Sequence, residues 1–233
     1  MSPTRYPPFP VVFALYPQVT QLDFTGPAEV FSRLPGAHLT LASVTGGLLE
    51  TESGITFAHV KPLAEVNDCS LLCVPGGFGT TAAMEDPAYL SSLRRLAAQA
   101  RYVTSVCTGS LLLGAAGLLR GKRAACHWAW RELLATFEAM PDPARVVREG
   151  NLFTGGGVTA GIDMALTVVA EIAGADFAQT LQLALEYAPD PPFTTGRPEA
   201  ARPEIVAAVR RRLDLLGANR EAAARRAANA LTT

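Results

Sequence analysis

The sequence lacks a strong charge of either sign, a long apolar run and a signal-like N-terminus. Its 20 Lys and Arg oppose 21 Asp and Glu, for a formal net charge of -1, whereas a nucleic-acid-binding protein would need a strongly basic surface. Its apolar stretches are far shorter than the roughly 20 residues that span a bilayer, and MSPTRYPPFP has no apolar core. We therefore expect no nucleic-acid and no membrane partner, and a cytoplasmic protein.

Cysteine is also scarce, with four residues in the chain: Cys69, Cys73, Cys107 and Cys126. Thiols stay reduced in the cytosol, so these residues are not expected to form a disulfide framework. Cys69 and Cys73 lack the paired spacing and the nearby histidine of a zinc site. The sequence therefore predicts no metal and no cofactor.

What the 233 residues do contain is an alternation of strand-like and helix-like segments. Continuous apolar runs such as FPVVFALY (9–16), SLLCV (70–74) and YVTSV (102–106) are typical of parallel strands buried on both faces. The pattern predicts an α/β fold with a mostly parallel central sheet, flanked by helices on both faces and flavodoxin-like. In such folds ligands bind at the carboxyl ends of the strands.

Capping signals predict where several helices begin. Asp86 and Pro87 suit the N-cap and first position of one helix, and Pro27 suits the first position of another. A further helix is expected over 129–137. Residues 1–195 are expected to form the α/β domain. Residues 196–233 should form a helical arm, packed on the same domain or in a dimer, with one basic helix over 204–231 whose arginines are solvated.

The segment TSVCTGSLLLGAAGLL (104–119) places Cys107 at the end of a strand and the start of a helix. This arrangement predicts a nucleophile elbow, in which a sharp turn holds a reactive side chain above the sheet edge. The amides from Thr108 onward lack intrahelical partners, so they could lower the pKa of the thiol or stabilise developing negative charge. The alternative is that Cys107 is a small buried hydrophobic residue, the usual fate of cysteine.

Three other segments follow strands and should meet at the same edge of the sheet. PGGFGT (75–80) and TGGGVTAG (154–161) offer glycine amides, and QLDFTGP (21–27) places Asp23 in a loop just before a helix. Each segment alone is weak, because Asp23 could only cap a helix and glycines often only turn the chain. Together they favour a site.

The chain resembles the ThiJ/PfpI superfamily of class I glutamine amidotransferase-like folds, and more closely the isocyanide (isonitrile) hydratases. The resemblance covers roughly residues 10–195. It rests on QLDFTGP, PGGFGT, RYVTSVCTGSLLLGAAGLLRGKRA, the HW of CHWAW, GGGVTAGID and LEYAPDPPF. It implies hydration of organic isocyanides to N-substituted formamides through a covalent cysteine thioimidate, with a small-molecule isocyanide as substrate and a homodimer as the assembly.

The resemblance also implies roles for single residues. Cys107 corresponds to the nucleophile and Asp23 to the catalytic acid/base. The backbone amides of Gly77 and Thr108 correspond to the anion-stabilising pair, and the Val158 amide to one that approaches the sulfur. His127 is the one histidine with an expected place near the site, where a structural and a catalytic role stay open.

Four other functions remain open at this stage. A ligand sensor would use the same pocket without turnover, although the segment after Tyr187 is short for the helix-turn-helix domain of such regulators. A glyoxalase or deglycase would carry glutamate where this chain has Asp23. A peptidase is disfavoured, because Thr108 stands where peptidases of the superfamily have histidine. A chaperone or redox-responsive protein would need only a reactive thiol.

Overall fold

A computed structural model describes residues 6–217 and 219–231 of the chain. Its central sheet has eight strands in the order β3-β4-β2-β1-β5-β6-β10-β9. The bounds are β1 Phe9–Ala14, β2 Ala37–Ser43, β3 Gly47–Glu50, β4 Thr56–Pro62, β5 Leu71–Val74, β6 Tyr102–Val106, β9 Val146–Glu149 and β10 Leu152–Gly155. The strands from β4 to β10 in this order pair in parallel, and only the outermost β3 and β9 are antiparallel. The predicted mostly parallel sheet is confirmed.

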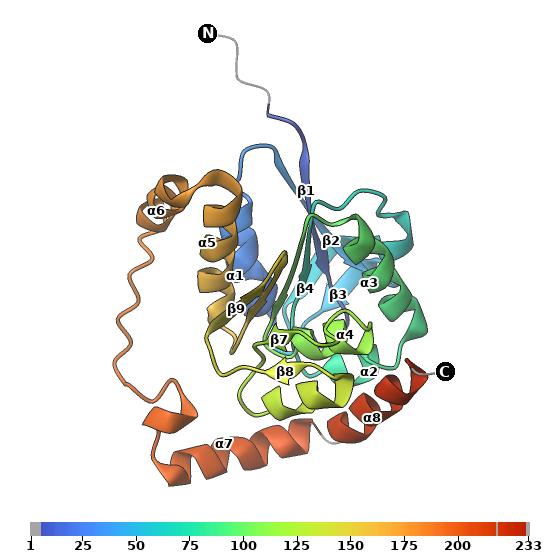
Figure 1. Ribbon diagram of the computed structural model, residues 1–233, viewed down its shortest axis with the longest axis vertical. Helices are drawn as coiled ribbons and strands as arrows, with labels where there is room; N and C mark the ends of the chain where they lie inside the picture. The colour runs from blue at the N-terminus through green and yellow to red at the C-terminus, as the bar shows by residue number, and fades with distance from the viewer. Residues whose placement is uncertain (1–5, 218, 232–233) are drawn as a thin grey trace.

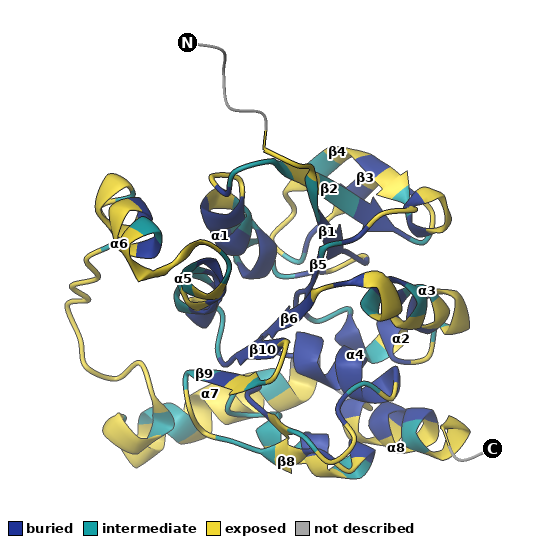
Figure 2. Cartoon of the chain, turned by 45° about the horizontal axis from the view of Figure 1, so that its top comes forward, coloured by how far each residue is buried: buried dark blue, intermediate teal, exposed yellow. Residues whose placement is uncertain are grey.

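Helices cover both faces of this sheet, as predicted (Figures 1 and 2). One face carries α1 Gln21–Phe31 and α5 Ala160–Ala173, with α6 Ala175–Ala184 packed on α5. The other carries α2 Thr80–Ala83, α3 Pro87–Gln99 and α4 Gly109–Ala115. Short 3-10 helices are η1 Leu63–Glu65, η2 Arg131–Phe137 and η3 Pro198–Ala200, and β7 Arg123–Ala124 pairs with β8 Met140–Pro141 outside the main sheet.

The centre of the sheet is wholly buried, which explains the uninterrupted apolar runs in the sequence. Every residue of β5 and β6 is buried, because helices lie over both faces. The polar side chain of Thr104 in β6 donates its hydroxyl to the Leu72 carbonyl at 3.0 Å. The Asp86 cap is confirmed, since its carboxylate accepts from the amides of Ala88 and Tyr89.

Two helix boundaries differ from the prediction. Helix α1 begins at Gln21, so Pro27 lies inside the helix and Asp23 lies in its first turn rather than in a loop. Pro27 removes the amide that would pair with the Asp23 carbonyl four residues earlier. Its ring instead packs against α5, where a methyl group on Gly161 would come within 3.0 Å of it. Helix 129–137 is also different, because it is a 3-10 helix that begins at Arg131.

The C-terminal arm is two helices rather than one. Helix α7 covers Pro203–Leu216 and α8 covers Arg220–Ala230, with a break at Gly217 between them. Both cross the end of the molecule opposite the start of β1 (Figure 1). Helix α8 packs against α2, α4 and η2, and its Arg220 is only 2% exposed, so the prediction that the arginines of this helix are solvated is wrong for Arg220. The domain boundary at 195 stays a prediction, and 1–5, 218 and 232–233 lie outside the described residues.

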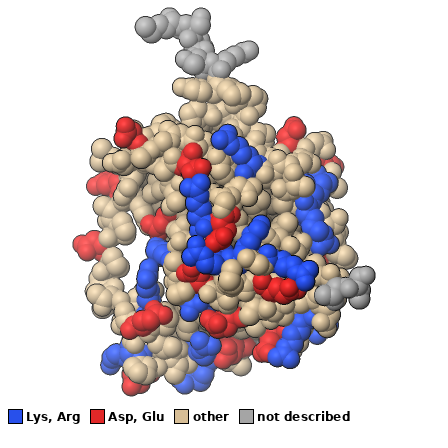
Figure 3. Space-filling model, viewed as in Figure 1, with Lys and Arg blue, Asp and Glu red and all other residues tan. Residues whose placement is uncertain are grey.

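The surface matches the balanced charge of the sequence. On the face drawn in Figure 3, basic and acidic side chains lie side by side. Several are paired, such as Arg226 with Glu85 at 2.6 Å and Arg148 with Glu171 at 2.8 Å. None of the helices formed by the described residues is both long and apolar enough to span a bilayer.

Candidate active site

Cys107 sits at a sharp turn between β6 and α4, as the sequence predicts. Its φ is +59°, a left-handed conformation that is rare for a residue with a side chain and costs on the order of 1–3 kcal/mol. Its backbone amide donates to the Gly155 carbonyl of β10 at 3.0 Å, which holds the turn. The strand ends at Val106 and the helix begins at Gly109, so Cys107 and Thr108 form the whole connection between them.

Two glycines are needed because the backbone is crowded at this turn. A methyl group on Gly109 would come within 2.0 Å of the Val74 carbonyl oxygen of β5. A methyl group on Gly76 would come within 2.6 Å of the Thr108 amide nitrogen and 2.9 Å of an Asp23 carboxyl oxygen. The elbow, the loop after β5 and the first turn of α1 therefore meet within van der Waals contact.

Asp23 is completely buried beneath this meeting point. One of its oxygens, Oδ2, accepts the Gly76 amide at 2.8 Å. The other, Oδ1, has no ordinary hydrogen-bond partner among the described residues. A buried polar atom without a partner is costly in a native protein and calls for an explanation. Asp23 does not cap its helix, because no side-chain capping bond forms at the start of α1.

Burial decides the protonation of Asp23. Its pKa is raised from 3.8 to about 8, chiefly by desolvation and in smaller part by nearby Glu52, while the Gly76 amide and the neighbouring Cys107 side chain act in the opposite direction. The carboxyl group is therefore mostly protonated at pH 7. It holds a proton next to the cysteine sulfur.

The pKa of Cys107 differs from the prediction. Burial raises it well above its usual value, Asp23 and Cys126 add to the rise, and the Thr108 amide and Arg220 oppose it. The Thr108 amide therefore lowers the pKa of the thiol as predicted, but desolvation outweighs it, so the net shift is upward. A neutral Asp23 would remove its part of the repulsion. Protonation of Asp23 and the positive charge of Arg220 therefore both favour the Cys107 thiolate.

Thr108 belongs to a buried network of hydroxyl groups. Its Oγ1 accepts the Gly77 amide at 3.0 Å and lies 2.8 Å from Thr80 Oγ1. Thr80 in turn lies 3.0 Å from the Tyr16 hydroxyl, which donates to the Pro75 carbonyl. The Gly77 amide is therefore engaged by a side chain, so its assignment to an anion, together with the Thr108 amide, stays a prediction.

A cavity of about 90 Å³ opens above Cys107. It brings together Cys107, Thr108, Gly77, Val158 and His127, and Asp23 lies just beneath it. The sequence interpretation missed three other kinds of lining residue. Thr20, Glu52 and Phe78 come from loops, Trp130 precedes η2, and Leu213 and Arg220 come from the arm.

His127 is neutral in this cavity. Burial, together with the Arg220 charge, lowers its pKa to about 4. Its Nδ1 accepts the Ala129 amide at 3.3 Å, which leaves Nε2 to carry the proton. A neutral imidazole is a much weaker acid than the Asp23 carboxyl group, so His127 is a poor replacement for Asp23 as the proton donor. Whether His127 has a structural or a catalytic role stays a prediction.

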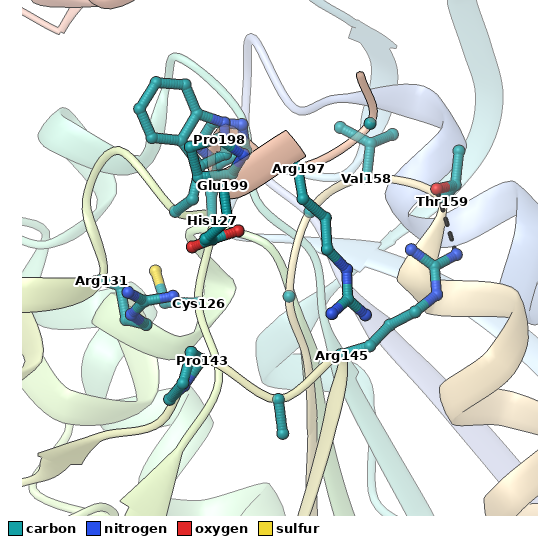
Figure 4. A pocket seen from close by; sticks show the side chains of 15 residues that line it. Cys126, His127, Arg131, Pro143, Arg145, Val158, Thr159, Arg197, Pro198 and Glu199 are labelled. Atoms are coloured by element: carbon teal, nitrogen blue, oxygen red, sulfur yellow. Dashed lines mark hydrogen bonds between the residues drawn. The ribbon is translucent and has the colours of Figure 1, made fainter. Parts of the chain in front are cut away.

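A second, larger cavity of about 230 Å³ adjoins the first and shares His127 and Val158 with it. Arg131, Arg145 and Arg197 line it, and Figure 4 shows the Arg197 side chain extending into this space while Arg145 is directed toward Thr159. Arg145 is held by Asp163, with 2.6 Å between Nε and Oδ2. The two cavities give a small reactive chamber with a wider space beside it.

Arg220 joins the arm to the reactive chamber. Its Nη2 donates to the carbonyl oxygens of Gly77 at 3.0 Å and Phe78 at 3.3 Å, and its Nε donates to Thr81 Oγ1 at 3.2 Å. Its guanidinium lies 4.6 Å from the centre of the Trp130 ring. The sequence offers no direct signal for this contact. The nearest is the alanine-rich face of α8, where Ala223, Ala224 and Ala227 are buried.

No group of three or more His, Cys, Asp or Glu able to hold a metal ion occurs among the residues that the structure describes. The chemistry of this site rests on one thiol, one protonated carboxyl group and a ring of amides and hydroxyls. These features define an α/β protein with a cysteine nucleophile elbow. The model of the DJ-1/PfpI family matches residues 10–171, and the chain belongs to this family.

Relatives within the family differ in what they do. The chain is 54% identical to an isonitrile hydratase from Pseudomonas putida, over 86% of this chain and 88% of that protein. It is 28% identical to the HTH-type transcriptional regulator GlxA from Rhizobium meliloti (strain 1021), over 72% of this chain and 52% of the regulator. A solved structure of a ThiJ/PfpI family protein from Pseudomonas syringae matches with a TM-score of 0.86 and 38% identity, over 96% and 92% of the two chains.

Proposed function

We propose that this protein hydrates organic isocyanides to N-substituted formamides. The observation that carries the proposal is the pairing of an elbow cysteine with a buried carboxyl group that keeps its proton at pH 7. An isocyanide carbon accepts a nucleophile and also needs a proton, and this pair supplies both. The 54% identity to an isonitrile hydratase over most of both chains supports the same reaction.

In the first step, the thiolate form of Cys107, present as the minor and reactive form of this buried thiol, bonds to the terminal isocyanide carbon while Asp23 gives its proton to that carbon. The product is a thioimidate, with a C–H bond, a C=N bond and a carboxylate on Asp23. The Thr108 amide faces the sulfur and favours the thiolate before attack. Covalent addition of this kind divides one difficult hydration into two easier steps.

In the second step, Asp23 acts as a base. Its carboxylate takes a proton from water as the water oxygen bonds to the thioimidate carbon. The C–S bond then breaks, the thiolate leaves, and the hydroxyl proton of the intermediate ends on the nitrogen of the formamide. Thiolate and protonated Asp23 are restored, so the sum of the steps is one isocyanide and one water giving one formamide.

The two cavities suit a substrate with a reactive end and a larger substituent. The reactive chamber of about 90 Å³ has room for the isocyano group over Cys107. The adjoining cavity of about 230 Å³ can take the organic substituent. His127 and Val158 lie between the two, where they would contact the atoms next to the isocyanide nitrogen.

The direct test is to incubate the purified protein with an alkyl isocyanide and follow the formamide by NMR. In D₂O the formyl carbon should carry deuterium, because its hydrogen comes from Asp23, which exchanges with solvent. Mass spectrometry of quenched protein should find Cys107 heavier by one isocyanide molecule. Binding without formamide would contradict hydration and point to a sensor. Labelling at another cysteine would contradict the assignment of the nucleophile.

We also propose a cytoplasmic homodimer. The four cysteines are free thiols, which suits a reducing compartment. The arm leaves large apolar side chains on the surface, among them Leu215 at 80% and Val209 at 41% exposed, and a second copy could cover them. Light scattering should give twice the 24.6 kDa of one chain, and a single-chain mass at micromolar concentration would contradict the dimer.

A further inference from the structure

We propose that Arg220 of the C-terminal arm is a positioning residue of the active site, which holds the loop at Gly77 and places a fixed positive charge on the cavity of Cys107. The effect on turnover rests on the proposed function. The effect on the thiol does not.

The first argument is that Arg220 is built into the site rather than resting on it. Its side chain is 2% exposed, and it makes three hydrogen bonds across 139–143 residues of sequence to the segment 77–81. Gly77 carries both links, because its carbonyl accepts from Arg220 and its amide donates to Thr108. Removing Arg220 would therefore release the loop that orients Thr108, the residue after the nucleophile.

The second argument is the charge of the groups around the sulfur. Titratable and charged groups reach this cavity from several elements: Tyr16, Asp23 of α1, Glu52 between β3 and β4, Cys126 and His127 after β7, and Arg220 of α8. Burial keeps Tyr16, Asp23, Cys126 and His127 neutral at pH 7. It raises the pKa of the first three groups and lowers the pKa of His127. Among the described residues that reach this cavity, Glu52 and Arg220 remain as the charged side chains.

The two remaining charges are not equivalent. Glu52 is occupied by the Thr20 hydroxyl at 2.7 Å and the Phe78 amide at 3.1 Å. Arg220 forms no ion pair within 4.0 Å among the described residues, and its bonds go to neutral oxygens and an aromatic ring. Guanidinium groups stay protonated in proteins. A buried cation without a counter-ion favours any anion that forms beside it, and the Cys107 thiolate is that anion.

The experiment measures the rate of Cys107 alkylation by iodoacetamide from pH 6 to pH 10, resolved by peptide mass spectrometry. It compares wild type with Arg220→Gln, Arg220→Lys and Arg225→Gln. Arg225 is the matched control, because it lies on the same helix, is exposed and, among the described residues, forms an ion pair with Glu221 alone. We expect Arg220→Gln to move the profile to higher pH and to lower the rate at pH 7 by about tenfold, while the control follows wild type.

Arg220→Lys keeps the charge but not the planar group whose Nε bonds the Thr81 hydroxyl while its Nη2 bonds the Gly77 and Phe78 carbonyls. It should therefore keep the pH midpoint of wild type and lose only stability. If Arg220→Gln fails to fold, Arg220→Lys decides alone. A shifted pH midpoint in Arg220→Lys would then overturn the electrostatic role. A folded Arg220→Gln whose rate falls without a shift of midpoint would also overturn it and leave a purely structural contact.

Turnover gives the second readout. If the protein hydrates isocyanides, Arg220→Gln should lower kcat with a KM close to wild type, and its pH-rate profile should shift with the alkylation profile. An unchanged kcat with a raised KM would contradict a role through the thiol. Because alkylation needs no isocyanide, its result stands even if no isocyanide is hydrated, and the two proposals fail separately.

Discussion

The reactive cavity has two sides of different origin. The elbow side consists of Cys107 and Thr108, from the turn between β6 and α4, with Asp23 of α1 buried next to them. The arm side consists of Trp130, which immediately precedes η2, and of Leu213 and Arg220 from the C-terminal helices. Burial makes the elbow side neutral at pH 7, while the arm side brings a permanent cation. The difference teaches that, under the proposed mechanism, the reacting groups and the buried cation come from separate parts of the chain.

The largest expected effect is on the elbow side. Cys107→Ser should abolish formamide production, at least about 1,000-fold below wild type, because a hydroxyl has a far higher pKa than a thiol and no base is placed to activate it. Circular dichroism and melting temperature should stay close to wild type. Cys69→Ala is the control, since Cys69 is also buried but does not line the cavity. Equal losses of formamide production in Cys107→Ser and Cys69→Ala would contradict a special role for the elbow side.

Asp23→Asn should have the next largest effect. The amide can still accept the Gly76 bond, and its shape matches the protonated carboxyl group, so the protein should fold. It cannot give up and take back a proton, so turnover should fall by on the order of 100-fold or more. Hydration at nearly the wild-type rate would show that Asp23 is only a buried hydrogen-bond acceptor and that the proton comes from elsewhere.

The same variant has a thermodynamic signature. Between pH 3.8 and about 8 the folded protein keeps the Asp23 proton that the unfolded chain has released. The free energy of unfolding of wild type should therefore fall as pH rises through this window and level off above it. Asn does not titrate. The stability of Asp23→Asn relative to wild type should thus grow from pH 4 to pH 8, by on the order of 5 kcal/mol. Urea titrations at each pH measure this difference in the free energy of unfolding. A difference that stays constant with pH would mean that Asp23 is ionised in the folded protein.

The sequence predicts the elbow side of the cavity much better than the arm side. The strand ends, the elbow at Cys107 and the sheet with its two faces are encoded in local patterns, since apolar runs and glycine turns stand next to each other in the chain. The arm side depends on packing between residues about 140 positions apart. Nothing in the basic pattern of α8 distinguishes Arg220 from the exposed Arg225 and Arg226. The direction of the Cys107 pKa was also out of reach, because desolvation is a property of the folded interior.

Thr108→Val should have a moderate effect that stays on the elbow side. It leaves the buried Gly77 amide without its acceptor, which costs about 1–3 kcal/mol of stability. Turnover should fall by about tenfold, because the loop and the Thr108 amide lose their shared anchor. Thr104→Val is the matched control, since Thr104 is also buried and bonds the Leu72 carbonyl. It should lose stability but not turnover. A similar loss of turnover in both would mean that activity only follows stability.

The smallest effect is expected on the arm side. Gly217 ends α7 where the Trp130 ring leaves no room, and a methyl group there would lie 2.5 Å from Trp130 Cζ2. Gly217→Ala must therefore push the ring away from its place 4.6 Å under the Arg220 guanidinium. We expect a cost of about 1 kcal/mol, a shift in tryptophan fluorescence and a few-fold loss of turnover. Gly196→Ala is the control for stability and fluorescence, because nothing lies within 4 Å of its added methyl group; its turnover is not compared, since Gly196 lines the adjoining cavity. If Gly217→Ala moves the fluorescence but leaves both turnover and Cys107 alkylation unchanged, the arm side covers the cavity without tuning it.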